Sequence, residues 1–236
     1  MTLKTSIILC TYNEANYIEE TILALKKNIK NVEIVIVDDN SNDGTKEIIN
    51  KFISDEQIKI IFRKKNKGLA SAFLRGLIET TGHKVGWIDT NMSELAPKFV
   101  EMENLLNSEN DIIILSRYIS GGGDNRKLLR RLSSKFFNII CRLIFRQNIK
   151  DYTSSIFLMK RNVINDVSFL GYGHGEFFIE FLYNAYKKGF KILEIPFIQK
   201  KDQNTFDSKS APNLIKFTYH AIMYSIRILI SLIRRK

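Results

Sequence analysis

Short apolar runs rich in β-branched residues alternate with stretches of helical spacing through the first half of the chain. The runs cover residues 6–10, 32–38, 58–62, 84–88 and 111–115. The helical stretches between them cover residues 14–27, 45–52, 68–80 and 97–106. Nearly continuous apolar strands are typical of parallel sheets that are buried on both faces. We therefore predict an α/β fold whose mostly parallel central sheet has helices on both faces.

Carboxylates stand where the run at residues 32–38 is expected to end. Asp38 and Asp39 fall at the carboxyl end of this strand, where open α/β sheets bind their ligands. Their oxygens can accept hydrogen bonds from ribose hydroxyls or base nitrogens. We interpret Asp38 and Asp39 as ligand contacts, and Asp43 and Thr45 as residues that cap the next helix.

A further acid, Asp89, follows the strand predicted at residues 84–88, and Asn91 lies two positions later. Carboxylate and amide oxygens are ligands that hard cations prefer. The sequence therefore predicts a site for Mg²⁺ or Mn²⁺ bridging a diphosphate. The chain has only two cysteines, which excludes a disulfide scaffold and a cysteine zinc cluster and favours a reducing compartment.

The formal net charge of +11 is unevenly distributed. Basic residues outnumber acidic ones by 11 to 2 in residues 117–161 and by 11 to 3 in residues 187–236. Such clusters suit phosphate groups, whether of a nucleotide, a nucleic acid or an anionic membrane. Nucleic acid is disfavoured, because the cations alternate with aliphatic residues rather than with stacking aromatics.

Each of these two basic segments contains an amphipathic stretch. Residues 127–146 combine helically spaced apolar residues with cations, as in helices that lie in a membrane interface. Residues 214–233 have about the length of a spanning helix, but Lys216, His220 and Arg227 interrupt them, so we expect a second interfacial helix. Since no signal peptide is evident, we expect a peripheral protein on the cytosolic face of a membrane.

Several motifs carry a family resemblance. They are Thr11-Tyr12-Asn13-Glu14, Asp38-Asp39-Asn40-Ser41 with Asp43-Gly44-Thr45, and Lys67-Gly68-Leu69-Ala70 with Ala72 and Gly76. Together they resemble the inverting family 2 glycosyltransferases. The continuation, Ser116-Arg117-Tyr118 with Gly121-Gly122, then Arg131, Ser133 and Asn138, then Asp151-Tyr152-Thr153-Ser154, resembles the polyprenyl-phosphate and dolichol-phosphate sugar synthases.

This resemblance implies a GT-A nucleotide-diphospho-sugar transferase fold over residues 1–210, followed by a membrane-associated helix at residues 211–236. It implies transfer of a hexose, with inversion and metal assistance, from a donor of the GDP-mannose or UDP-glucose type. The acceptor would be a polyprenyl or dolichyl phosphate at the cytosolic membrane face. The sequence leaves open whether a separate membrane-anchor subunit takes part.

The resemblance also assigns roles to individual residues. It places the nucleotide against Thr11, Tyr12, Asn13, Glu14, Asp38, Asp39, Lys67 and Gly68. It makes Asp89 and Asn91 the metal ligands, and Asp89, Arg117 and Arg131 the catalytic residues. Further substrate contacts would come from Lys200, Lys201, Ser208 and Lys209.

Two departures from the family pattern keep alternatives open. Asn91 replaces the usual second acid of the metal motif, and Lys200 or Lys201 stands where an arginine is usual. A neutral amide should weaken metal binding, so a degenerate nucleotide-sugar-binding protein is one alternative. Another is a family 2 transferase that acts on a glycan or glycolipid hydroxyl. That reaction needs a base, with Glu176 or Glu180 as candidates, unless Glu180 is instead the structural partner of an arginine.

Overall fold

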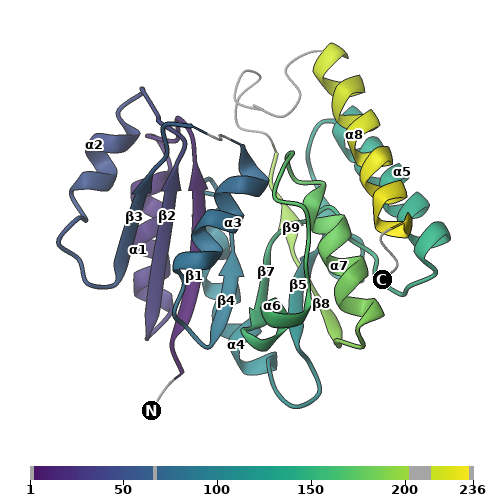
Figure 1. Cartoon of the computed structure of the whole chain (residues 1–236), viewed down its shortest axis with the longest axis horizontal. Helices are drawn as coiled ribbons and strands as arrows, with labels where there is room; N and C mark the ends of the chain where they lie inside the picture. The colour runs from purple at the N-terminus through teal and green to yellow at the C-terminus, as the bar shows by residue number, and fades with distance from the viewer. Residues whose placement is uncertain (1–2, 66–67, 202–213, 234–236) are drawn as a thin grey trace.

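The computed structural model describes residues 3–65, 68–201 and 214–233, and Figure 1 shows their arrangement. A seven-stranded sheet has the order β3-β2-β1-β4-β7-β5-β8. Its strands are β1 (Thr5–Thr11), β2 (Val32–Asp38), β3 (Ile58–Phe62), β4 (Lys84–Trp87), β5 (Ile112–Ser116), β7 (Phe157–Lys160) and β8 (Ile192–Pro196). Only β7 is antiparallel to its neighbours, β4 and β5. The prediction of a mostly parallel sheet is thus confirmed.

Two short strands, β6 (Gly123–Asp124) and β9 (Ile198–Gln199), pair in parallel beside the main sheet. They connect the loop that follows β5 to the segment that follows β8. Gly122 lies at a close approach in this loop, because a Cβ there would stand 2.7 Å from the carbonyl oxygen of Ser116. The pairing holds the loop after β5 at the carboxyl edge of the sheet.

Helices cover both faces of the sheet, as the sequence predicted. The first face carries α1 (Ile18–Asn28), α2 (Thr45–Asn50) and α4 (Ala96–Leu105), whose apolar residues pack on β1, β2 and β5. A 3₁₀ turn, η1 (Ser93–Leu95), leads into α4. The second face carries α3 (Leu69–Glu79), α6 (Asn162–Asp166) and α7 (Phe177–Lys187). Each helix buries its apolar side against the β-branched strands, which excludes water from both faces of the sheet.

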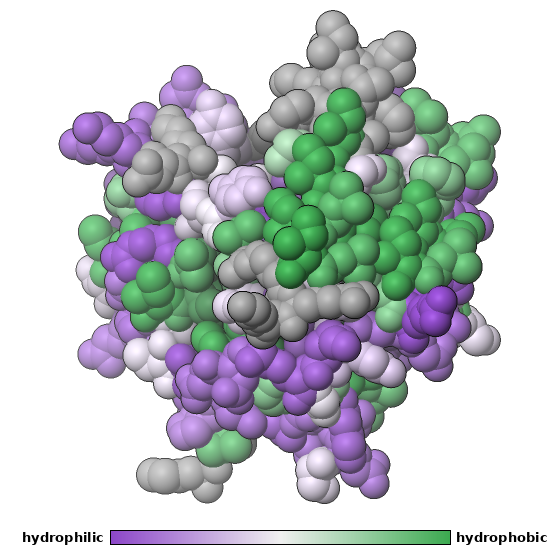
Figure 2. Space-filling model, turned by 45° about the vertical axis from the view of Figure 1, so that its right-hand side comes forward, coloured by the Kyte–Doolittle hydropathy of each residue, from purple (hydrophilic) through white to green (hydrophobic). Residues whose placement is uncertain are grey.

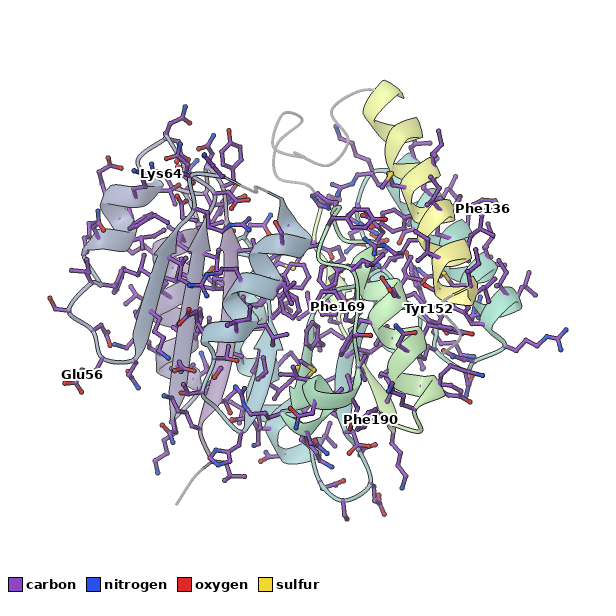
Figure 3. All side chains as sticks on the ribbon, in the orientation of Figure 1. Glu56, Lys64, Phe136, Tyr152, Phe169 and Phe190 are labelled. Carbon is purple, nitrogen blue, oxygen red and sulfur yellow. The ribbon has the colours of Figure 1, made fainter. Side chains whose placement is uncertain are left out.

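Aromatic rings dominate the second face. Phe73 of α3 stacks on Phe177 of α7 at 5.2 Å between ring centroids, and Phe177 stacks on Trp87 of β4 at 5.4 Å. Phe169, labelled in Figure 3, lies between the two helices and contacts both Phe73 and Phe177. This cluster joins the β1–β4 half of the sheet to the β7–β8 half.

The two amphipathic segments form long helices, α5 (Leu128–Phe145) and α8 (Leu214–Ile233). They lie together at the end of the molecule farthest from β3 (Figure 1), and the rings of Phe137 and Tyr224 meet at 5.4 Å. Neither of them, nor any other helix in the described ranges, is both long and apolar enough to cross a bilayer.

One predicted helix starts later than expected. The helical spacing predicted a start at Glu14, but α1 begins at Ile18. Asn13 has a φ of 56°, and the N–H groups of Tyr17 and Ile18 both donate to the carbonyl oxygen of Glu14. The residues after β1 therefore form a turn, which keeps them at the carboxyl edge of the sheet.

Candidate active site

The carboxyl ends of β1, β2 and β4 meet at one edge of the sheet. Thr11 is paired with Asp38 in the register of β1 and β2, and the N–H of Asp39 donates to the carbonyl oxygen of Thr11 at 3.0 Å. Asp89 follows β4, on the other side of β1. We call this region the acidic edge; it comprises residues 11–14, 38–39 and 89.

The loops after β1 and β2 form one bonded wall at the acidic edge. The N–H of Asn13 donates to Oγ of Ser41 at 2.8 Å, and its side-chain oxygen accepts from the N–H of Asn42 at 2.9 Å. The N–H of Glu14 donates to Oγ1 of Thr45 at 2.8 Å. Since these bonds fix both loops, ligand contacts from Asn13 and Glu14 need little reordering on binding.

Asp38 stabilises the loop after β2 through buried hydrogen bonds. Its side chain is fully buried, and its two oxygens accept from the N–H and the hydroxyl of Ser41. Asp38 thereby orients the Ser41 hydroxyl that receives the Asn13 N–H.

Asp39 ties the end of β2 to the start of α3. Its carboxylate accepts from the N–H of Gly68 at 2.8 Å and from Nε of Arg63 at 2.6 Å. Arg63 also donates to the carbonyl oxygen of Gly68 at 3.1 Å. Gly68 has a φ of 132°, which strongly favours glycine. Arg63 was missed by the sequence analysis, although its position directly after β3 is a signal that could have found it.

Thr11 has a polar atom that remains without a partner. Its side chain is only 3% exposed, and its Oγ1 makes no hydrogen bond to any part of the chain that the structure describes. A buried hydroxyl is costly to leave unbonded. Thr11 is therefore suited to bond a polar ligand at the acidic edge.

The carboxylate of Asp39 is paired with an arginine, whereas that of Asp89 lies near another carboxylate. Burial and the nearby carboxylate of Glu14 raise the pKa of Asp89 to about 6, while Arg130 at the start of α5 acts in the other direction. Two carboxylates in a region of low dielectric favour a bound cation. Arg130, which the sequence analysis did not single out, is thus placed within electrostatic range of Asp89.

The residues around Asp89 suit a metal cation that takes some of its ligands from a bound substrate. No three His, Cys, Asp or Glu side chains within the described ranges gather as a metal-binding group. Asp89 and the exposed Asn91 offer two oxygen ligands. Mg²⁺ commonly takes one or two carboxylates and obtains its remaining ligands from water and substrate phosphates.

Arg117 lies at the carboxyl end of β5, in the other half of the sheet, and is 3% exposed. Its Nε and Nη2 bond the two oxygens of Asp151 at 2.8 and 2.7 Å, and Nη2 also donates to Oγ1 of Thr153 at 2.7 Å. Its Nη1 lies 3.9 Å from Asp124. This bidentate pairing fixes the plane of the guanidinium group.

A cavity of about 510 Å³ opens beside Arg117, between the loop after β5 and one face of α5. We call it the cationic pocket; its basic lining residues are Arg117, Arg131, Lys135, Arg142 and Lys150. Of these, Arg131, Lys135 and Arg142 form no ion pair with any described residue, and Nε of Arg142 is buried without a partner. Unpaired cations around a cavity favour an anionic ligand.

The first turn of α5 lies between the two regions. Arg130 is within electrostatic range of Asp89, and the next residue, Arg131, lines the cationic pocket. The structure thus groups Thr11, Asn13, Glu14, Asp38, Asp39 and Asp89 at the acidic edge, with Gly68 bonded to Asp39, and Arg117 and Arg131 at the pocket.

The remaining predicted site residues are exposed, paired or outside the described residues. Tyr12, within the acidic edge, is 46% exposed, and Lys201 is exposed. Lys200 pairs with Glu94 of η1 at 3.2 Å. Lys67, Ser208 and Lys209 lie outside the described residues.

The two candidate bases are engaged in internal contacts. Glu180 is fully buried and pairs with Arg227 of α8 at 2.7 Å, as the structural reading of Glu180 predicted. Glu176 is 1% exposed and accepts from the N–H of His174 at 2.9 Å.

Open α/β sheets bind their ligands in the crevice beyond the carboxyl ends of the strands, which is where the acidic edge lies. The family model described as glycosyl transferase family 2 matches residues 6–168, and the chain belongs to this family. The fold predicted from the family resemblance is therefore confirmed.

Curated relatives extend beyond the family match. The chain is 30% identical over 233 residues to a protein named dolichol-phosphate mannosyltransferase from Pyrococcus furiosus, covering 94% of this chain and 64% of that protein. It is 25% identical over 236 residues to the polyprenol monophosphomannose synthase of Mycolicibacterium smegmatis, covering 96% and 88%. The chain thus spans somewhat less than two thirds of the length of the first relative.

Solved structures agree on the fold. The glucosyl-3-phosphoglycerate synthase of Mycobacterium tuberculosis in complex with UDP superimposes with a TM-score of 0.74 at 16% identity, covering 97% of this chain and 80% of that one. The same enzyme with Mn²⁺, UDP and glucosyl-3-phosphoglycerate gives a TM-score of 0.73, with the same coverage.

Proposed function

We propose that this protein moves a hexose from a nucleotide sugar to a polyprenyl phosphate at the cytosolic face of a membrane. The observation that carries this proposal is the cationic pocket, which borders the exposed apolar face of α5 through Leu132 and Ile139. The relatives named for dolichol and polyprenol phosphate support the same acceptor class. In this proposal residues 1–210 are catalytic and residues 211–236 associate with the membrane; the boundary between them lies outside the described residues.

The acidic edge would hold the donor, of the GDP-mannose or UDP-glucose type. The orphan hydroxyl of Thr11 and the side chains of Tyr12, Asn13 and Glu14 would line the nucleotide. Asp39 and Gly68 would form the floor beneath it, while the ring of Tyr12, which is 46% exposed, would stack on the base. Asp89 and Asn91 would hold a metal ion beside the diphosphate.

The cationic pocket would hold the phosphate of the acceptor. Leu132 and Ile139 line the pocket together with the cations, and both are also exposed on α5. This arrangement suits an amphiphile whose phosphate lies among Arg131, Lys135 and Arg142 while its chain continues over the apolar face. An inorganic or sugar phosphate would make no use of that apolar border.

The apolar face itself is broad. Figure 2 shows a continuous hydrophobic area over α8 and α5. Its exposed members are Leu128, Leu129, Leu132, Phe136, Ile139, Leu143 and Ile144 of α5, with Ile222, Ile226, Leu229 and Ile233 of α8. Phe136 points outward from α5 (Figure 3). A contiguous exposed patch of this kind supports docking on a membrane surface, with or without a separate anchor subunit.

The reaction would proceed by direct displacement with inversion. An oxygen of the acceptor phosphate forms a bond to the anomeric carbon as the bond from that carbon to the leaving diphosphate breaks. The acceptor phosphate is ionised near neutral pH, so this chain need not supply a general base. Arg130 and Arg131 would stabilise negative charge on the two phosphate groups. Mg²⁺ or Mn²⁺ bound by Asp89 and Asn91 would supply further charge neutralisation for the leaving group.

A hydroxyl acceptor would require a base, and both candidates are buried and engaged in internal contacts. Glu180 neutralises Arg227, and Glu176 accepts a backbone N–H. The arrangement therefore favours an acceptor that is already ionised.

A panel of labelled nucleotide sugars, incubated with the protein and a membrane lipid extract, tests the proposal with and without a chelator. We expect label in an acid-labile polyprenyl-phosphate sugar, and loss of this product when the chelator is present. Label in an alkali-stable glycolipid would instead identify a hydroxyl acceptor. Nucleotide binding without turnover of any donor would identify a degenerate binding protein.

A further inference from the structure

A buried arginine of α8 holds the chain segment at residues 170–173. Arg227 is 1% exposed, and its Nη1 pairs with Glu180 of α7 at 2.7 Å. The same guanidinium donates to the carbonyl oxygens of Leu170, at 3.4 Å, and of Tyr172. It also lies over the Tyr172 ring, 4.7 Å from the ring centroid.

The other side of this segment reaches the acidic edge. The carbonyl oxygen of Gly173 accepts the N–H of Ala70, in the first turn of α3, at 3.3 Å. Just before Ala70, the N–H of Gly68 donates to Asp39. Gly173 has a φ of 92°, and a Cβ there would stand 2.0 Å from Oε1 of Glu176. The segment is therefore bonded to α8 on one side and to the start of α3 on the other.

Stability alone does not explain the buried charges. An ion pair loses hydration when it is buried, and apolar residues of similar size often hold two helices together equally well. An apolar side chain at position 227, however, could not bond the carbonyl oxygens of Leu170 and Tyr172. The guanidinium thus specifies where the segment lies relative to α8.

We propose that Arg227 is a positioning residue that couples the seating of α8 on a bilayer to nucleotide binding at the acidic edge. The connection runs from Arg227 through residues 170–173 to the first turn of α3 and Asp39. The inference rests on the proposed function, because it takes the acidic edge as the nucleotide site and α8 as part of the membrane face. Coupling of two binding equilibria is reciprocal, so bound nucleotide strengthens membrane binding by the same factor.

The decisive variant is the double substitution Arg227→Met with Glu180→Met. It removes both buried charges together, so it avoids the unpaired carboxylate that Arg227→Met alone would leave. Arg227→Lys is the conservative variant, which keeps the charge but not the planar fork. Lys187→Met, which removes an exposed cation from α7, is the matched control. Thermal unfolding checks that each variant is folded.

Two measurements on the full chain follow. Amide hydrogen exchange at Gly68 and Ala70 reports the position of the first turn of α3 without any ligand. Titration with UDP and with GDP, in the presence and absence of vesicles containing anionic phospholipid, reports nucleotide affinity and its dependence on the membrane.

In the double variant we expect faster exchange at Gly68 and Ala70 and about 3- to 30-fold weaker nucleotide binding. Vesicles should tighten nucleotide binding to the wild-type protein and to Lys187→Met, but not to the double variant. Arg227→Lys should fall between them.

Unchanged exchange and unchanged affinity in a folded double variant would overturn the coupling, and so would weaker binding without faster exchange at these two amides. If the wild-type chain bound neither UDP nor GDP, the proposed function would fail instead. The two failures are therefore distinguishable.

Discussion

Asp39 follows β2 and Asp89 follows β4, so both lie at the carboxyl edge of the sheet. Their surroundings nevertheless differ. Asp39 accepts hydrogen bonds from Arg63 and Gly68, so its charge is compensated within the protein. Asp89 lies near Glu14, and burial together with that carboxylate raises its pKa. Asp39 thus organises the site, whereas Asp89 is suited to meet a cation brought with the substrate.

Replacing Asp89 tests this difference. We expect Asp89→Ala to lower the transfer rate about 100-fold or more, because neutralisation of the leaving diphosphate would be lost. Transfer assays at increasing Mn²⁺ concentration, together with nucleotide titrations, measure the effect. Glu101→Ala, at an exposed position on α4, is the control and should retain wild-type activity. Full activity of Asp89→Ala would contradict the assignment of Asp89 as a metal ligand.

A second residue-scale prediction concerns stability and pH at the opposite edge of the sheet. Burial of Glu33 would raise its pKa, but hydrogen bonds from Ser6, Thr81 and Lys4 outweigh burial and lower the pKa to about 2. A carboxylate with a lowered pKa contributes its full stability above the usual value near 4.5 and loses it as the pH falls toward 2.

We therefore expect Glu33→Gln to lower the free energy of unfolding by about 2 kcal/mol at pH 7. The difference from the wild type should shrink between pH 4.5 and 2. Urea unfolding at a series of pH values measures it, with the exposed Glu109→Gln as control. A difference that stayed constant with pH would contradict the electrostatic origin of the effect.

At the scale of elements, α5 has three chemically different faces. Arg130 faces the acidic edge, Arg131, Lys135 and Arg142 face the cationic pocket, and the outer face is apolar. Neighbouring residues on a helix are separated by about 100° around its axis, so adjacent arginines serve different regions. In the proposed function, one helix would thus contact donor, acceptor and membrane.

The pocket face of α5 is tested by Arg142→Met. We expect the KM for the lipid acceptor to rise about tenfold, since a charge-assisted contact to phosphate is worth roughly 1.5 kcal/mol or more. The KM for the donor should change little. Lys127→Met removes a cation from the start of the same helix without altering the pocket, so it controls for general attraction to anionic lipid. Equal effects of the two substitutions would argue against a specific phosphate site.

At the scale of the whole molecule, α5 and α8 place half of the large exposed apolar residues of the described chain at one end (Figure 2). Leu143 of α5 is 72% exposed and Leu229 of α8 is 57% exposed. Burying a leucine side chain in an apolar environment contributes about 1.5 kcal/mol or more. Both helices should therefore contribute to membrane binding.

We expect the double variant Leu143→Ser with Leu229→Ser to bind vesicles about 100-fold more weakly, as measured by sedimentation. Ile78→Ser, which alters a residue that is 69% exposed on α3, should bind like the wild type. If Ile78→Ser weakened binding as much as the double variant, the membrane-facing surface would have to be placed elsewhere.

The sequence alone determined the α/β class, the parallel strands β1 to β5 and the existence of the two amphipathic helices. Periodicity reports these features, because a buried parallel strand is apolar throughout and an amphipathic helix repeats every 3.6 residues. The sequence also located most of the acidic edge, since residues directly after parallel strands gather at one side of the sheet.

Only the tertiary structure decided how these parts meet. The antiparallel β7 inserts between β4 and β5, which a short apolar run at residues 156–159 does not reveal. Local pattern also cannot show that Arg63 bonds Asp39, or that Arg227 reaches Glu180 across 47 positions of the chain. Such contacts depend on how distant elements pack, because the partners of a charged side chain are set by three-dimensional proximity rather than by spacing along the chain.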